Sequence, residues 1–269
     1  MGLVACYFFK RVTTKRFISY KNLKKNMEDI DYDVISNVEA LRVKYGDRKI
    51  VYPCPLPLVL GTHEEAFKEL NTDSIRPAED LELTLFINGA FENVDKEPEW
   101  NKAKYFLLDS FRIPKRCLYK PTEDITGPGI LVERDTQGFG RSSEIDYNNA
   151  ITKGGWKMED GIYVNEDLGM NFVPDSQYKG GALHTNEFVK DGLVKALLGG
   201  EESAEIFAKT AQDYGRELWS LPIELSYPGK KEVIMMPKLG YNEAGHFSVG
   251  ANDSGSGFNV YALGVRKAA

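Results

Sequence analysis

The sequence has few cysteines and no long apolar run, which several classes of protein require. Its three cysteines, Cys6, Cys54 and Cys117, are widely spaced, with no CxxC pair and no neighbouring histidine. This spacing argues against a disulfide scaffold and against a zinc site, and it favours buried free thiols. No apolar run approaches the roughly twenty residues of a membrane span, so none is expected.

The amino-terminal order of apolar residues followed by Lys and Arg is the reverse of a signal peptide's order, so no signal peptide is expected in this chain. A leader removed earlier would leave the same sequence, and the cellular location stays open. The net charge is -6, and the longest basic stretch, residues 21–25, is followed by an acidic one. We therefore expect no nucleic-acid partner.

Histidine is also scarce, and the three present, His63, His184 and His246, show neither a triad pattern nor metal-ligand spacing. The sequence thus predicts no catalytic residues, no metal site and no cofactor. With 42% hydrophobic and 12% aromatic residues in 269, the chain has the composition of a soluble globular protein.

One segment, residues 244–265, lacks charge almost entirely. Its single charged side chain is Asp253, whereas a chain that is 28% charged would place roughly six there. The segment also has no Lys, Glu, Gln, Met or Trp. Every residue type present is reached from an asparagine codon by changing its first two bases, which favours a residue-randomised cassette. A Gly/Ser-rich surface loop is the alternative.

The end of this segment has the pattern of a strand. Residues 258–265 alternate, with Phe258, Val260 and Ala262 on one side and Asn259 and Tyr261 on the other. We expect a paired strand here, so that small polar residues are held on a rigid element and its loops.

The first hundred residues predict both helices and strands. Thr62 and Glu65 form a capping box that begins one helix, and a second helix is expected within residues 34–45, ended by Gly46. Residues 3–9 and 81–87 have strand-like composition.

The remaining residues predict strands on both sides of a helical region. We expect an extended run over 103–119 that turns at Ile113-Pro114, and a hairpin over 156–164 around Asp160-Gly161. Helices over 186–198 and 203–214 and a strand over 232–236 follow. This order indicates an α+β fold whose last strand can pair near the first, rather than a nucleotide-binding βαβ sheet.

Residues 207–224 resemble the helix and following motif of the formylglycine-generating-enzyme class of the C-type lectin fold. The matching residues carry a four-residue insertion, and the usual Thr and the later Trp-Glu are missing; the matches are Gly215, Arg216, Leu221, Pro222 and Glu224. Residues 264–266 are similar to the Gly-Phe-Arg of that fold's last strand, and residues 105–117 to its first strand. The resemblance covers about residues 102–269.

The resemblance implies a C-type lectin-like fold with two helices, mixed short strands and long loops. The lectin-like display domain would span residues 101–269. Residues 1–100 would be an amino-terminal extension, packed on this domain or part of it.

The same fold is the display scaffold of variable proteins diversified by diversity-generating retroelements, and the residue alphabet resembles that of the archaeal type. The resemblance implies a variable segment over 241–261 with ligand-binding residues Tyr241, Asn242, His246, Ser248, Asn252, Asp253, Ser254, Ser256, Phe258, Asn259 and Tyr261. It implies a constant scaffold that includes Trp219, Leu221, Pro222, Gly264 and Arg266. Glu243 is not reached from the same codon, so it is scaffold or lies outside the cassette.

Three other functions are alternatives for this sequence. An oxidase of the formylglycine-generating class needs a late cysteine pair, and no cysteine follows Cys117. A calcium-dependent lectin could use Asn252 and Asp253, but the tripeptide patterns of sugar-binding lectins are absent. A structural or phage-tail-like surface protein without a varied site is the third. The favoured hypothesis is a non-enzymatic protein that binds a protein or another surface macromolecule. The resemblance also implies a location at the cell surface.

Overall fold

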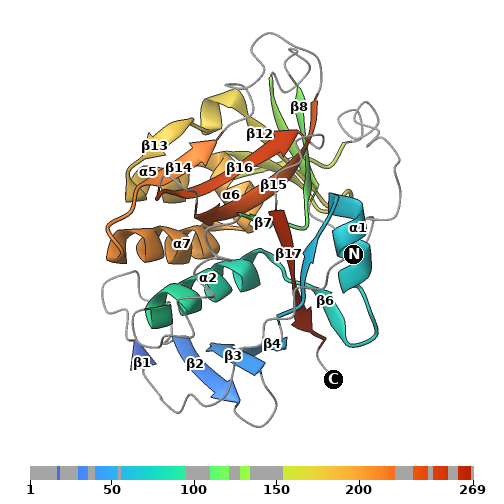
Figure 1. Ribbon diagram of the computed structural model, residues 1–269. Coiled ribbons are helices and arrows are strands. Elements are labelled where there is room, and N and C mark those ends of the chain that lie inside the picture. Colours follow the sequence, from blue (N-terminus) through green and yellow to red (C-terminus); the bar gives the residue numbers. More distant parts are fainter. Residues whose placement is uncertain are drawn as a thin grey trace.

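The computed structural model describes residues 17–18, 30–35, 40–53, 56–94, 110–120, 128–133, 154–221, 233–241, 245–253 and 260–267. They form two sheets with helices packed between and against them (Figure 1). Helices and strands are both abundant and do not alternate as βαβ units, so the α+β class expected from the sequence is confirmed. No helix within the described part of the chain is long and apolar enough to cross a membrane.

A small antiparallel sheet is built from β1 (Phe17–Ile18), β2 (Ile30–Ile35), β3 (Ala40–Tyr45) and β4 (Arg48–Pro53), in that order. Leu41, Val43 and Tyr45 alternate into the core, and Gly46, with φ 55°, makes the turn to β4. The helix predicted within residues 34–45 is therefore wrong. The apolar spacing has period two from Leu41 onward, and Gly46 is a hairpin residue rather than a helix end.

Two helices come from the first hundred residues. The α1 helix (His63–Leu70) begins at the predicted capping box, in which Thr62 Oγ1 accepts from the Glu65 backbone N–H at 3.3 Å. The α2 helix (Asp80–Val94) includes residues 81–87, so the strand predicted there is wrong. A short apolar run fits either structure, and here a longer helix with residues buried all round is what forms.

The larger sheet has the order β10-β11-β12-β9-β8-β15-β16-β14-β13, and β17 joins it through β7. β5 and β6 pair with β17 on its other side. The strands are β5 (Leu58–Leu60), β6 (Ile75–Pro77), β7 (Ser110–Arg112), β8 (Arg116–Lys120), β9 (Gly129–Glu133), β10 (Lys157–Glu159), β11 (Ile162–Asn165), β12 (Met170–Pro174), β13 (Gly181–Leu183), β14 (Leu218–Leu221), β15 (Val233–Tyr241), β16 (Phe247–Asp253) and β17 (Val260–Arg266).

Several sequence predictions for this sheet are confirmed. The hairpin of β10 and β11 turns at Asp160-Gly161, and β7 and β8 flank the predicted turn at Ile113-Pro114. The last strand, β17, pairs in parallel with β7, the first described strand after residue 100. The strand expected over 232–236 is longer and forms β15.

The helix predicted over 186–198 is in fact two, α5 (Thr185–Lys190) and α6 (Gly192–Leu198). Asp191, with ψ 125°, interrupts the helical backbone, and its carboxylate accepts from the backbone N–H of Val194 at 3.0 Å. The residue is therefore an N-cap rather than a helix interior residue. A 3-10 turn, η1 (Asp175–Gln177), precedes them, and α7 (Glu201–Asp213) confirms the helix predicted over 203–214.

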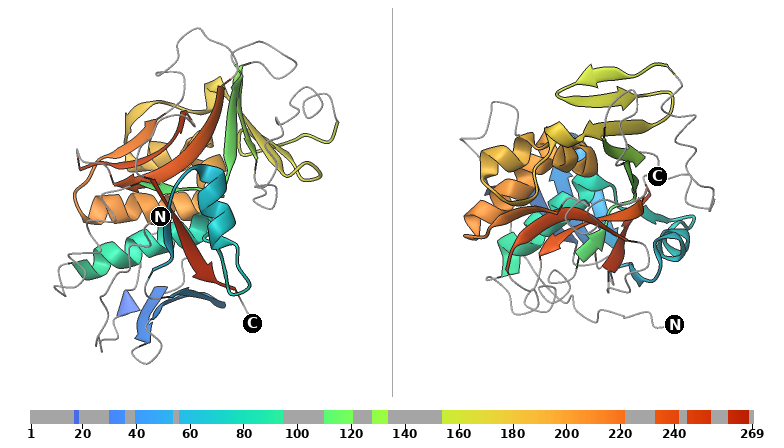
Figure 2. Two further views of the ribbon diagram at one scale, coloured as in Figure 1. Left: turned by 45° about the vertical axis from the view of Figure 1, so that its right-hand side comes forward. Right: turned by 90° about the horizontal axis from the view of Figure 1, so that it is seen from above.

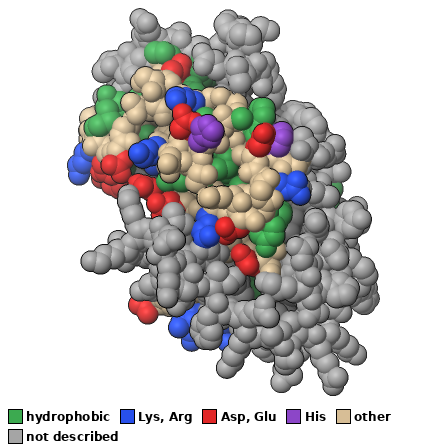
Figure 3. All heavy atoms as spheres, turned by 90° about the vertical axis from the view of Figure 1, so that its left-hand side faces the viewer, with side chains coloured by type: hydrophobic (Ala, Val, Ile, Leu, Met, Phe, Trp, Pro, Cys, Tyr) green, Lys and Arg blue, Asp and Glu red, His purple; other side chains and the backbone are tan. Residues whose placement is uncertain are grey.

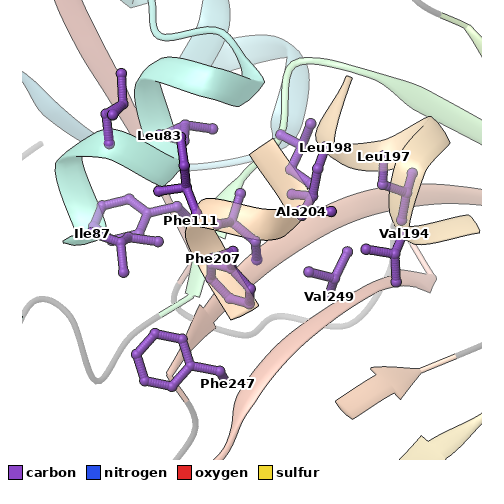
Figure 4. Close-up of a cluster of buried hydrophobic side chains, with 14 of the residues drawn as sticks. Leu83, Ile87, Phe111, Val194, Leu197, Leu198, Ala204, Phe207, Phe247 and Val249 are labelled. Atoms are coloured by element: carbon purple, nitrogen blue, oxygen red, sulfur yellow. The ribbon is translucent and has the colours of Figure 1, made fainter. Parts of the chain in front are cut away.

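The main core lies between the larger sheet and the helices, and α2 lies between α7 and the small sheet (Figures 1 and 2). Phe207 of α7 packs edge-on against Phe247 of β16 with ring centroids 5.1 Å apart (Figure 4). Buried Asn88 of α2 donates to the hydroxyl of Thr210 on α7 at 2.8 Å. These contacts hold β16 against a rigid helical layer, and β16 carries part of the predicted variable segment.

Candidate functional site

The predicted variable segment, residues 241–261, begins at the end of β15, includes β16 and ends at the start of β17. β15 and β16 are antiparallel, with Tyr241 opposite Phe247 and Met235 opposite Asp253. β17 then begins at Val260, opposite Ser110 of β7. The described parts of the segment therefore lie on a sheet held by neighbours on both sides, as the sequence pattern predicts.

Much of the uncharged segment, residues 244–265, belongs to the core. Phe247, Val249 and Ala251 of β16 are buried, as are Leu263 and Val265 of β17. A charged side chain at such positions would lose its hydration without a partner, so burial alone excludes charge there. The lack of charge over residues 244–265 thus has a packing cause at these positions, and codon bias is not needed to explain them.

Two predicted ligand-binding residues do not present their side chains freely. Ser248 is only 4% exposed. Tyr261 is half-buried and packs against the main core, while Ala262 on the other face packs against α1. Both faces of β17 are thus packed at these two residues, one against the main core and the other against α1. Burial therefore limits the access of a ligand to Ser248 and Tyr261, and their role in binding stays a prediction.

His246 immediately precedes β16 and forms a cluster with Glu217, which precedes β14, and with Trp219 of β14. Its ring stacks on the indole of Trp219, with centroids 5.0 Å apart and 3° between the planes. The Glu217 carboxylate accepts from Trp219 Nε1 at 3.2 Å and lies 3.4 Å from His246 Nε2. Figure 3 shows histidine side chains beside Asp and Glu side chains on one face of the molecule.

Trp219 was predicted as part of the constant scaffold, and the structure places it outside the main core. Its side chain is partly exposed, because β14 places Leu218 and Ser220 in the interior and Trp219 on the opposite face. The indole instead supports the ring of His246. Gly264 has the tight surroundings expected of scaffold, and Arg266 is exposed at the end of β17.

The other predicted residues are described in part or not at all. Tyr241, Leu221, Asn252 and Asp253 are placed as strand backbone, with no description of their side chains. The remaining predicted residues lie outside the described chain: Asn242, Pro222, Ser254, Ser256, Phe258 and Asn259, together with Glu243, Cys6, Cys54 and the strand expected over residues 3–9.

Sequence reasoning missed a pair of cationic residues on this sheet. Arg112 of β7 and Lys238 of β15 are directly opposite each other. Their chain neighbours Phe111 and Leu239 are fully buried, so the two cations lie on the face away from the main core. In each strand the sequence shows a cationic residue next to an apolar one. This pattern does not predict which strands pair, so it could not show that the two cations are opposite each other.

Burial explains the raised pKa values of two ionisable side chains. Burial raises the pKa of Asp191 to about 6, although backbone N–H donors oppose the shift. Burial also raises the pKa of the Cys117 thiol to about 12, so this cysteine is a core residue and not a nucleophile. Within the described residues, no group of three or more His, Cys, Asp or Glu side chains could hold a metal ion.

Comparison with known proteins gives one structural match. No family profile matches the sequence, and no curated protein matches it. The fold is similar to a solved chain from work on how the C-type lectin fold accommodates massive sequence variation in Nanoarchaeota. The TM-score is 0.46 at 12% identity, over 79% of this chain and 97% of that one. A similarity of this size is no argument about function.

Proposed function

We propose that this chain is a ligand-binding protein without catalytic activity, which displays a variable surface near its carboxyl terminus on a C-type lectin-like scaffold. The variable surface would be made by His246 and residues 252–259, and a diversity-generating retroelement of the archaeal type would vary it. The ligand would be a protein or another surface macromolecule.

One observation carries the proposal: a single segment combines buried strand residues with small polar and aromatic residues at the strand ends. Phe247, Val249 and Leu263 are fixed by core packing. Residues 252–259, Asn-Asp-Ser-Gly-Ser-Gly-Phe-Asn, fall between the buried part of β16 and the buried part of β17. Variation confined to these positions would leave the packing of the scaffold unchanged.

The residue types at the positions outside the core also support variation by codon randomisation. His246 and residues 252–259 still include neither Lys nor Glu, although both residue types are usually exposed on protein surfaces. They remain within the set reached from an asparagine codon.

The same residue types suit a binding surface. Tyr, Phe and His provide rigid contact area at a low entropy cost, and Ser, Asn and Gly provide adaptable hydrogen bonds. The stack of His246 on Trp219 would present a varied ring on a constant platform.

A codon library tests whether the scaffold tolerates this variation. Positions 246 and 252–259 would be randomised with codons of free first and second bases, displayed on cells, and scored for protease resistance before selection against protein ligands. A matched library would randomise the buried positions 247, 249 and 251 in the same way. The proposal predicts that most clones of the first library fold and that few of the second do. Equal losses in both libraries would contradict it.

A further inference from the structure

The strand β10 forms an open edge of the larger sheet. It is the first in the strand order, and among the described strands it pairs only with β11. Its three residues, Lys157, Met158 and Glu159, are all exposed, and Met158 is 55% exposed. Figure 2 shows the hairpin of β10 and β11 (yellow-green) at the outer margin of the molecule. An accessible edge of this kind can pair with a strand of another chain.

The hairpin turn determines which backbone groups of β10 point toward the open edge. Glu159 lies opposite Ile162, so the loop consists of two residues, Asp160 and Gly161, which both have positive φ. In a hairpin with such a loop, the pair that closes the loop exchanges both backbone hydrogen bonds, and hydrogen-bonded pairs alternate with non-hydrogen-bonded ones along the strands. The backbone N–H and C=O groups of Met158 therefore point away from β11.

The charges of β10 are arranged symmetrically about Met158. Lys157 precedes this residue and Glu159 follows it. In an antiparallel pair of two β10 strands with Met158 of each copy opposite Met158 of the other, Lys157 of each copy lies opposite Glu159 of the other. Opposite charges stabilise such cross-strand pairs, whereas like charges destabilise them. Charges on an edge strand often keep other chains away, but this pair of opposite signs attracts a second copy.

Met158 also continues an apolar row on the sheet face away from the main core. It lies opposite Tyr163, which in turn lies opposite Phe172. Tyr163 and Trp156 pack against a small buried cluster that includes Phe172. Two Met158 side chains that face each other across paired edges would lengthen this row and remove apolar surface from water. Methionine suits such a contact because its flexible side chain adapts to an irregular surface.

We propose that a second copy of this chain binds at β10, so that two molecules form one continuous antiparallel sheet across a twofold axis at Met158. Met158 of each copy donates its backbone N–H to the carbonyl oxygen of Met158 in the other, and the two pairs of Lys157 with Glu159 flank this contact. The same surface serves both copies, as a twofold interface requires. Because a three-residue strand provides few contacts, the dimer is a weak one. The inference does not depend on the proposed function, since β10 lies outside residues 241–261.

Charge exchange within β10 tests both the partner and the register. Sedimentation equilibrium of the full chain would measure the dimer dissociation constant at concentrations from about 10 µM to about 1 mM. K157E and E159K each convert both attractive pairs into repulsive ones, whereas the double variant K157E/E159K restores opposite charges and keeps the net charge. K190E is the control for a change of charge alone, because Lys190 is an exposed residue of α5. Thermal melts of every variant check that it folds.

We expect a dissociation constant of roughly 0.1 mM for the wild type, as suits a small interface. K157E and E159K should each weaken dimerisation at least about tenfold, and the double variant and K190E should stay close to the wild type. An equimolar mixture of K157E and E159K should also dimerise like the wild type, because two glutamates on one edge then face two lysines on the other. Three results would overturn the proposal: no self-association up to about 1 mM, dimerisation that K157E and E159K leave unchanged, or failure of the double variant or the mixture to associate.

Discussion

His246 and Trp219 lie face to face, with ring centroids 5.0 Å apart and planes 3° from parallel. Trp219 belongs to β14 and His246 immediately precedes β16, its parallel neighbour. The contact joins a residue that we propose is varied to one that we propose is constant. Both rings are partly exposed, so the contact supports the surface more than it supports the core.

The stack should contribute little to folding. We expect a double-mutant cycle of W219A and H246A to give a coupling free energy of about 0.5–1.5 kcal/mol, the range for aromatic pairs. Chemical denaturation of the four proteins measures it. A coupling of about 3 kcal/mol would show that the pair is a core contact and that His246 is not free to vary.

Neighbouring residues 246 and 247 should respond very differently to substitution. H246S should cost at most about 1 kcal/mol of unfolding free energy, as is usual at the surface. F247A should cost about 3–5 kcal/mol, because Phe247 is fully buried against Phe207 and Phe91. Urea denaturation of the two variants compares them directly, and similar losses would contradict the division between displayed and core positions.

Gly264 should not tolerate a side chain. A Cβ atom there would lie 2.7 Å from Ile75 Cγ2 and 2.9 Å from Leu70 Cδ2, so G264A should cost about 1–3 kcal/mol by overpacking. G154A is the matched control, since a Cβ at Gly154 would meet nothing within 4 Å. Thermal melts should show a lower midpoint for G264A alone; an unchanged midpoint would refute the tight packing of β17 on α1 and β6.

Asp191 should make stability depend on pH. Its pKa in the folded protein is about 6, above the ordinary 3.8, so its protonation favours folding. The contribution is fully present below pH 3.8 and is lost as the pH rises through 6. The unfolding free energy of the wild type relative to D191N should therefore fall by roughly 2 kcal/mol between pH 4 and pH 7.5. A difference that is flat or rises with pH would contradict the burial of this carboxylate.

How well the sequence predicted the fold depended on whether the deciding contacts were local. The capping box at Thr62 and the turn at Asp160-Gly161 are local, and both were predicted correctly. The strand β3 and the helix α2 were misassigned, because their apolar residues face partners that are distant in sequence. Asp191 broke a predicted helix because its carboxylate caps the next one.

The location of the candidate site stays a prediction, which the resemblance placed over residues 241–261. Residue types favoured a randomised cassette over residues 244–265. They could not show that Ser248 is buried, that α1 covers one face of β17, or that Arg112 and Lys238 face each other, since all three depend on tertiary pairing. The burial of Phe247 and Leu263 also gives a packing cause for part of the missing charge that codon bias was invoked to explain.

Comparison of the 3′ coding segment among sibling genomes, and with nearby genomic DNA, tests the central claim most directly. The account predicts that substitutions concentrate at codon 246 and codons 252–259, stay within the asparagine-derived alphabet, and spare Phe247, Val249 and Leu263. It also predicts a near-copy of the segment beside a reverse transcriptase gene. Substitutions spread evenly over buried and exposed positions, or rich in Lys, Glu, Gln, Met and Trp, would contradict it.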